Sequence, residues 1–251
     1  MEWWEDPYLR DEVLMRRTRI RRPVAMSDGL KPDDRRPLNR VLANPPPGYQ
    51  VPYRRQGWRH VGWSATGVRR RLTLAHIVQD GRAVGAIKFA EYRLAAMLFD
   101  EEFYDALDSD SAEEEKLACA IVSAWDWACL EIGGYGDIIE CREVWMEPGH
   151  VQPVAWSTVI HAMLRELFSS GAAFFVHAFP LEYDGRSPVH APSYVGFQRR
   201  QKAMIRMAER RFGLRSLPGP FGEEGWMWAP APRVAGYIDA PKYNEDWVSE
   251  L

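Results

Sequence analysis

The sequence lacks any long apolar run. None of its hydrophobic stretches reaches the roughly 18–20 residues that a helix needs to cross a bilayer. The first six residues, MEWWED, carry three acidic side chains where a secretory signal would be basic, and no apolar core follows them. These absences predict a cytoplasmic protein that has no membrane partner.

Cysteine is also scarce. Only Cys119, Cys129 and Cys141 are present, and none belongs to a Cys-x-x-Cys motif. His150 and His161 are eleven residues apart and have no carboxylate at metal-ligand spacing. No Gly-x-Ser-x-Gly, Walker or His-Glu-x-x-His motif occurs. We therefore expect reduced thiols and no metal site.

The residues that are present suffice for a full core. The 251 residues are 46% hydrophobic and 27% charged. Residues 1–71 hold sixteen Lys/Arg and eight Asp/Glu, a net charge of +8. Residues 72–251 hold sixteen Lys/Arg and twenty-seven Asp/Glu, a net charge of −11. Arginines cluster at 16–22, 54–55 and 69–71. These clusters can bind nucleic-acid phosphates, or they can pair with the chain's own stretch 100–115, which has nine Asp or Glu.

Proline density suggests how the chain is divided. Residues 23–53 contain seven prolines, which interrupt helices and sheet ladders. We expect an Arg- and Pro-rich N-terminal helix (1–22) and extended arm, together spanning residues 1–56. One domain would then occupy 57–230, with a helical insertion at about 93–132, and residues 231–251 would form a tail.

Hydrophobic periodicity gives the element order within the domain. Apolar stretches at 72–78 and 83–90 flank Asp80-Gly81, which is the strongest short signal for a hairpin. The remaining pattern predicts helices at 93–107, 112–131, 156–169 and 195–211, and strands at 137–146, 172–179 and 226–229. The strand–helix–strand unit at 137–179 predicts a parallel pair with a crossover helix in an α/β (α+β) fold that has helices on both faces of the sheet.

This order resembles the GCN5-related N-acetyltransferase family over about residues 70–230. The hairpin HIVQDGRAVGAIKF is similar to the family's second and third strands, and GDIIECREVWMEP is similar to its fourth. The stretch AAFFVHAFPLEY resembles the fifth strand, and MIRMAERRFGLRSLPG resembles the closing helix. The resemblance implies a mixed, mostly antiparallel central sheet. It also implies transfer of an acetyl or other acyl group from acetyl-CoA or another acyl-CoA to an amine.

The resemblance further implies a set of cofactor-binding residues. They lie at the end of the fourth strand and at the start of the next helix: Val144, Trp145, Met146, Gln152, Val154, Ala155, Trp156, Ser157 and Thr158. Glycines normally let the backbone of this turn approach the pyrophosphate. Here Ala155 and Ser157 replace the two glycines, Pro153 removes an amide donor, and Trp156 is bulky. The alternative is an ordinary strand-to-helix turn.

Two carboxylates on the strand 137–146 are candidate catalytic bases. An amine must lose a proton to attack a thioester, and Glu140 and Glu143 could accept it. Strict alternation would place Glu143 and Trp145 on one face and Glu140 and Arg142 on the other. The structural alternative for each carboxylate is an ion pair with Arg142 or across the strands. The family's usual tyrosine acid is replaced by Glu209.

Other functions stay open. The chain could be a degenerate, non-catalytic binding or regulatory protein with this fold, or a transferase that uses another donor, such as an aminoacyl-tRNA. A nucleic-acid partner would bind the Arg-rich arm. Four tryptophans beside arginines, Trp3, Trp4, Trp58 and Trp63, could stack on its bases or simply pack between the arm and the domain. The amine acceptor is undefined, a homodimer is one expected assembly, and His177 is expected to be a core histidine.

Overall fold

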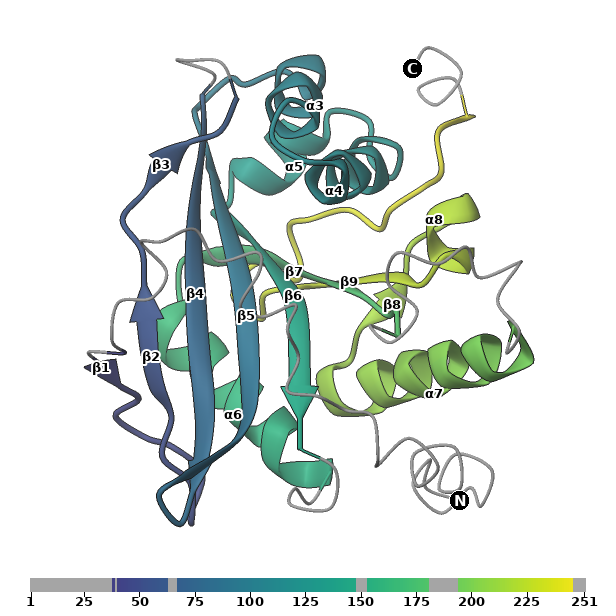
Figure 1. Ribbon diagram of the computed structural model, residues 1–251. Helices are drawn as coiled ribbons and strands as arrows, with labels where there is room; N and C mark the ends of the chain where they lie inside the picture. The colour runs from purple at the N-terminus through teal and green to yellow at the C-terminus, as the bar shows by residue number, and fades with distance from the viewer. Residues whose placement is uncertain (1–37, 39, 63–66, 148–152, 181–193, 246–251) are drawn as a thin grey trace.

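A single mixed sheet organises the described residues, which are 38, 40–62, 67–147, 153–180 and 194–245 of this computed structural model (Figure 1). The strand order is β1-β2-β4-β5-β6-β7-β9-β8, and β3 pairs with β4 off this path. Every pairing in this sheet is antiparallel except that of β6 with β7. The expected mixed, mostly antiparallel sheet is therefore confirmed.

The strands are β1 (Arg40–Val41), β2 (Pro52–Arg55), β3 (Arg59–His60), β4 (Val68–Gln79), β5 (Arg82–Leu94), β6 (Asp137–Met146), β7 (Gly171–His177), β8 (Arg215–Ser216) and β9 (Trp226–Pro230). The helices are α3 (Asp100–Asp108), α4 (Ala112–Val122), α5 (Ala128–Gly133), α6 (Pro153–Leu167), α7 (Tyr194–Phe212) and α8 (Gly219–Glu223). Among the described residues, no helix is long and apolar enough to cross a membrane.

The predicted hairpin is confirmed and is longer than expected. Asp80 and Gly81 have φ values of 51° and 75°, as a tight two-residue turn requires, and β4 pairs with β5 along almost its whole length. The helix predicted from residue 93 is wrong at its start, because β5 continues to Leu94 and α3 begins at Asp100. The helix predicted at 112–131 is likewise divided into α4 and α5.

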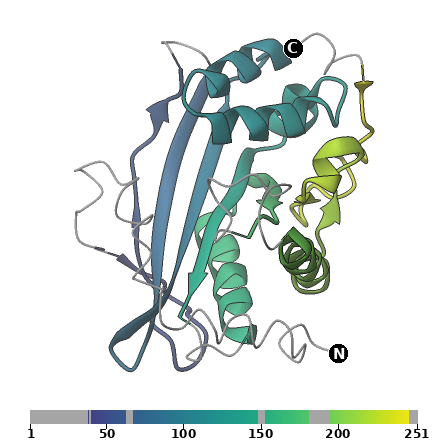
Figure 2. The ribbon, with the colours of Figure 1, turned by 45° about the vertical axis from the view of Figure 1, so that its right-hand side comes forward.

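The two faces of the sheet have separate cores. On one face, α3, α4 and α5 bury Phe103, Leu117 and Ile121, whereas on the other α6 buries Val159 and Met163. Figure 2 shows the α3–α5 group near one end of the sheet and α6 beside the other end. Amphipathic spacing in each helix supplies these apolar faces.

The segments on either side of the expected domain, residues 40–55 and 231–245, pack against the sheet or its core, although an arm and a tail were expected there. Residues 40–55, expected within the extended arm, contribute β1 and β2, and Pro52 is the first residue of β2, a position that tolerates proline. Residues 231–245 pack on the domain: Val234 and Ile238 are buried, and the Trp125 indole N–H donates to the Asp239 carbonyl at 2.8 Å. The helix expected at 1–22 lies outside the described residues.

Candidate functional site

The parallel strands β6 and β7 pair over only part of their length. Their register runs from Asp137 opposite Gly171 to Cys141 opposite Val176. β6 then continues to Met146 with β5 as its partner, and no described residue pairs with its other edge over 142–146. The predicted parallel pair is thus present, and within the described part of the chain the second backbone edge of β6 has no strand partner beyond Cys141.

A β-bulge in β6 changes which side chains share a face. Lys88 lies opposite Glu143 and Phe89 lies opposite Cys141, so Arg142 is the additional residue. Strict alternation is consequently wrong beyond Arg142. Glu143 shares a face with Lys88 and Glu140, whereas Val144 and Met146 pack against the α6-side core.

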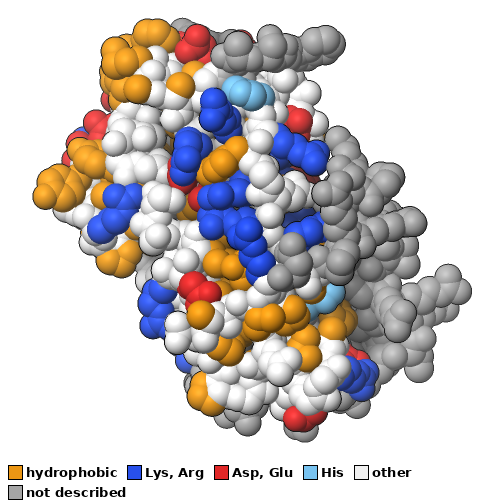
Figure 3. Space-filling view, turned by 90° about the vertical axis from the view of Figure 1, so that its left-hand side faces the viewer, with side chains coloured by type: hydrophobic (Ala, Val, Ile, Leu, Met, Phe, Trp, Pro, Cys, Tyr) orange, Lys and Arg blue, Asp and Glu red, His pale blue; other side chains and the backbone are white. Residues whose placement is uncertain are grey.

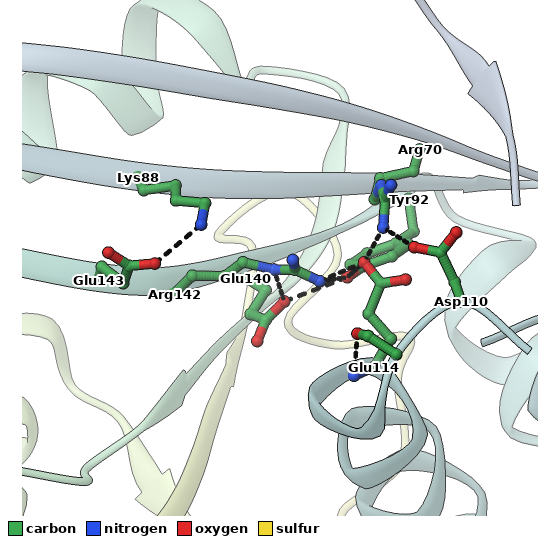
Figure 4. A network of polar contacts seen from close by, with 9 residues as sticks. Arg70, Lys88, Tyr92, Asp110, Glu114, Glu140, Arg142 and Glu143 are labelled. Atoms are coloured by element: carbon green, nitrogen blue, oxygen red, sulfur yellow. Dashed lines mark hydrogen bonds and ion pairs between the residues drawn. The ribbon is translucent and has the colours of Figure 1, made fainter. Parts of the chain in front are cut away.

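Glu143 lies on the part of β6 that extends beyond β7. Its Oε1 accepts a bond from Lys88 Nζ at 2.8 Å, and its side chain is 27% exposed (Figure 4). The cross-strand ion pair weighed as the structural alternative is therefore present. Because the carboxylate is still partly exposed, it could exchange a proton with a bound molecule.

Glu140 is enclosed in a polar network beneath α4 (Figure 4). Its Oε2 accepts from Arg142 Nε at 2.8 Å and lies 3.2 Å from the Tyr92 hydroxyl. The same hydroxyl lies 3.1 Å from Glu114 Oε1, which also accepts from Arg70 and Arg142. The single hydroxyl hydrogen of Tyr92 can be donated to only one of these two carboxylates at a time.

Burial and the neighbouring charges shift the pKa values of this network in a consistent way. Burial raises the pKa of Glu114, and burial also raises the pKa of Tyr92 well above its usual value, so the phenol stays protonated. Burial alone would lower the pKa of Arg142, but Tyr92, Glu140 and Glu114 raise it well above its usual value. Arg142 therefore remains a cation and anchors the carboxylates around it.

Tyr92 and Glu114 are not distinguished by the sequence pattern. Tyr92 belongs to an apolar stretch of β5, and Glu114 is one of three consecutive glutamates, of which its neighbour Glu113 is exposed. The available signal was the arginine run at 69–71 together with Arg142, since buried guanidiniums require acceptors. The acidic stretch 100–115 supplies acceptors for Arg70 and Arg142, but the sequence does not indicate which of its carboxylates is buried.

The candidate cofactor residues have different surroundings. Val144, Trp145 and Met146 are half-buried at the open end of β6. Trp156 is half-buried at the start of α6, and its ring centroid lies 5.8 Å from that of Phe212 on α7.

The polar candidates on α6 are less open to a ligand. Ser157 is only 3% exposed and Thr158 is half-buried, so the Ser157 hydroxyl suits a packing role better than a phosphate contact. Gln152 and the side chains of Val154 and Ala155 lie outside the described residues.

The basic clusters of β2 and β4 pair within the chain. Arg55 and Arg71 both contact the buried carboxylate Glu91, and Arg70 contacts Asp110 and Glu114. Figure 3 shows Lys and Arg side chains gathered on the face that the β1–β4 side of the sheet presents. The expected pairing with the acidic stretch 100–115 is therefore confirmed for Arg70, whereas Arg55 and Arg71 pair with Glu91, an acid of β5 outside that stretch.

The structure shows the surroundings of two aromatic residues discussed from the sequence, Trp58 and His177. The guanidiniums of Arg71 and Arg93 lie 4.2 and 4.4 Å from the ring centroid of Trp58, so this indole packs within the domain. His177 stacks on Trp226 at 4.5 Å between ring centroids and contacts the Glu224 carbonyl at 3.1 Å. Burial lowers the pKa of His177 to about 4, which fits a neutral packed histidine.

Three further observations complete the description. Among the described residues, no group of three or more His, Cys, Asp or Glu is arranged to hold a metal ion. Cys119 is half-buried, Cys129 and Cys141 are buried, and all three are free thiols. Comparisons with family models, curated proteins and solved structures found no match for the chain.

Proposed function

We propose that the protein is an acyl-CoA-dependent N-acyltransferase, which transfers an acetyl or other acyl group to an amine. The observation that carries this proposal is the early end of the β6–β7 pairing at Cys141 opposite Val176. The pantetheine part of coenzyme A is thin and contains two amides. It can therefore bind the free β6 edge at 142–146 much as an extended peptide adds to a sheet.

Glu143 is the preferred base in this proposal. It lies beyond the last β6–β7 pair and keeps part of its side chain exposed. It would accept a proton from the ammonium form of the acceptor, and the neutral amine nitrogen would then bond to the thioester carbonyl carbon. As the C–S bond breaks, the leaving thiolate would take up the second proton that the nitrogen loses, giving the amide and the free thiol of coenzyme A. Lys88 would orient the Glu143 carboxylate through their ion pair. Glu140, enclosed by Arg142 and Tyr92, would hold the strand in place.

A binding assay followed by a transfer assay tests the proposal. Acetyl-CoA at about 100 times its dissociation constant should stabilise the fold by roughly 2.7 kcal/mol, measured as a rise in melting temperature. In an assay with a panel of amines, Glu143→Gln should lower transfer about 100-fold and leave the thermal shift unchanged. Glu147→Gln, just past the end of β6, is the matched control and should leave both readings unchanged.

No thermal shift at millimolar acetyl-CoA would contradict the proposal. Equal transfer by the wild type and Glu143→Gln would contradict the assignment of the base alone.

A non-catalytic binding protein is the second candidate. It is favoured by the finding that Glu140 and Glu143 both have cationic partners within the chain. This candidate predicts that acetyl-CoA, or coenzyme A itself, produces the thermal shift while no amine in the panel is acylated.

A further inference from the structure

A cluster of large apolar side chains is exposed where β5 leads into α3 and where α5 begins. Its members are Met97, Phe99, Trp127 and Leu130, which are 73%, 52%, 62% and 43% exposed. The Asp100 carboxylate accepts 2.8 Å bonds from the backbone N–H groups of Ala128 and Cys129. These bonds hold the 97–99 loop beside the start of α5, which brings the four exposed residues close together; we call them the Trp127 surface.

Backbone strain supports a binding role for the Trp127 surface. Met97 and Trp127 have φ values of 66° and 63°, in the left-handed region. This conformation costs a bulky residue roughly 1–2 kcal/mol, and such strain concentrates at functional positions. Because both side chains are exposed, packing in the protein's own core does not offset this cost. Large exposed apolar residues held close together are typical of interaction surfaces.

Acidic residues surround the Trp127 surface. Glu101 and Glu102 follow Phe99, Asp126 precedes Trp127, and Glu131 follows Leu130. None of these four carboxylates forms an ion pair with another described residue. The occupant should therefore combine apolar side chains with positive charge.

We propose that the chain's own segment Val13–Arg22 binds the Trp127 surface. Its sequence, VLMRRTRIRR, contains four apolar residues, five arginines and no acidic residue. The apolar residues would pack on Trp127 and its neighbours, and the arginines would neutralise the surrounding carboxylates. This contact is independent of the acyl-CoA proposal, because it uses no residue of the β6 edge.

The intervening chain is long enough for this contact. Residues 23–37 span about 50 Å when extended, at roughly 3.3 Å per residue. The register places Arg40 of β1 opposite Tyr53, which lies opposite Ala75 of β4. Ala75 is seven residues from Val68, the β4 residue that pairs with Leu94, and this distance is about 23 Å along the strand. The extended length of residues 23–37 exceeds it.

Hydrogen exchange of the full-length chain, read by mass spectrometry, tests the proposal. Changing Arg16, Arg17, Arg19, Arg21 and Arg22 together to Glu should raise exchange at residues 124–131 about tenfold. Conversely, Leu130→Ser should raise exchange at residues 13–22 by a similar factor. Val195→Ser, on α7 and 61% exposed, is the matched control and should leave residues 13–22 unchanged.

Two results would overturn the proposal. The first is unchanged exchange at 124–131 in the arginine variant together with unchanged exchange at 13–22 in Leu130→Ser. The second is protection of 124–131 that is lost on dilution of the wild type, because a second copy of the chain would then cover the surface. Protection that is independent of protein concentration and weakened by 0.5 M NaCl supports binding within the chain.

Discussion

At the residue scale, buried Glu114 joins α4 to the sheet. Its Oε1 accepts from Arg70 and Arg142 and lies 3.1 Å from the Tyr92 hydroxyl, while its side chain is fully buried. Replacing Glu114 with Gln would leave two largely buried guanidiniums without their shared anion. We expect Glu114→Gln to lower the free energy of unfolding by about 3 kcal/mol, measured by urea denaturation.

The neighbouring Glu113 provides the control for this prediction. It is exposed on the same helix, so Glu113→Gln should change the free energy of unfolding by less than about 0.5 kcal/mol. Equal stability of the two variants would show that the Glu114 network contributes little to the fold.

His177 should make stability depend on pH. Burial lowers its pKa to about 4 in the folded state, against about 6.5 in the unfolded chain. Between these values the unfolded state binds more protons. The contribution of neutral His177 to the free energy of unfolding is therefore complete above pH 6.5 and is lost as the pH falls toward 4.

We expect this loss to be about 2 kcal/mol, measured as the free energy of urea unfolding between pH 7 and pH 4. In His177→Gln the difference in the free energy of unfolding between pH 7 and pH 4 should be smaller by that amount. An identical pH profile for the variant and the wild type would assign the acid sensitivity to other groups.

At the element scale, the β4–β5 turn allows the contribution of the Gly81 backbone conformation to stability to be measured on its own. A Cβ added at Gly81 would meet nothing within 4 Å, but its φ is 75°. Gly81→Ala should therefore lower the free energy of unfolding by about 1 kcal/mol through backbone strain alone. Gly57→Ala adds a Cβ that also meets nothing and has no positive φ, so it should be nearly neutral in the same urea experiment.

The hairpin and the β6–α6–β7 unit were predictable because local patterns encode them. Asp80-Gly81 sets the turn, and apolar stretches of the right length set the strands and the crossover helix. The ends of β4 and β5 were not predictable, because Arg69, Arg71 and Glu91 replace the apolar alternation there. There the backbone ladder between β4 and β5 continues, and the Arg71–Glu91 ion pair joins residues that are distant in sequence.

The candidate site was predictable only in part. Glu140 and Glu143 could be located on one strand, but the Arg142 bulge that brings them to the same face leaves no local signal. Glu114 could not be singled out from its neighbours, because its burial depends on where α4 packs. The location of the β6–β7 separation likewise depends on tertiary structure.

At the scale of the whole molecule, the reactivity of the three thiols reports how well the folded core excludes solvent and reagents. Cys129 and Cys141 are buried and their pKa values are raised by burial, while burial raises the pKa of the half-buried Cys119 to about 11. The thiolate is the reactive form. At pH 8 we expect Ellman's reagent to label the native chain slowly, at Cys119 first, and all three thiols rapidly in urea.

Rapid labelling of Cys129 or Cys141 in the native protein would contradict this prediction. It would indicate frequent opening of the α5 or β6 region, where these two residues lie.

The short β6–β7 pairing also affects motion. Five residue pairs connect β6, with the strands β1–β5 beside it, to β7 and the strands β8 and β9 that follow. We expect the two parts of the sheet to pivot about this narrow junction, with the largest relative displacement at Met146. Such collective movements occur on microsecond-to-millisecond timescales, so relaxation-dispersion NMR should detect slow exchange at 142–146 that decreases when an elongated ligand bridges the two parts.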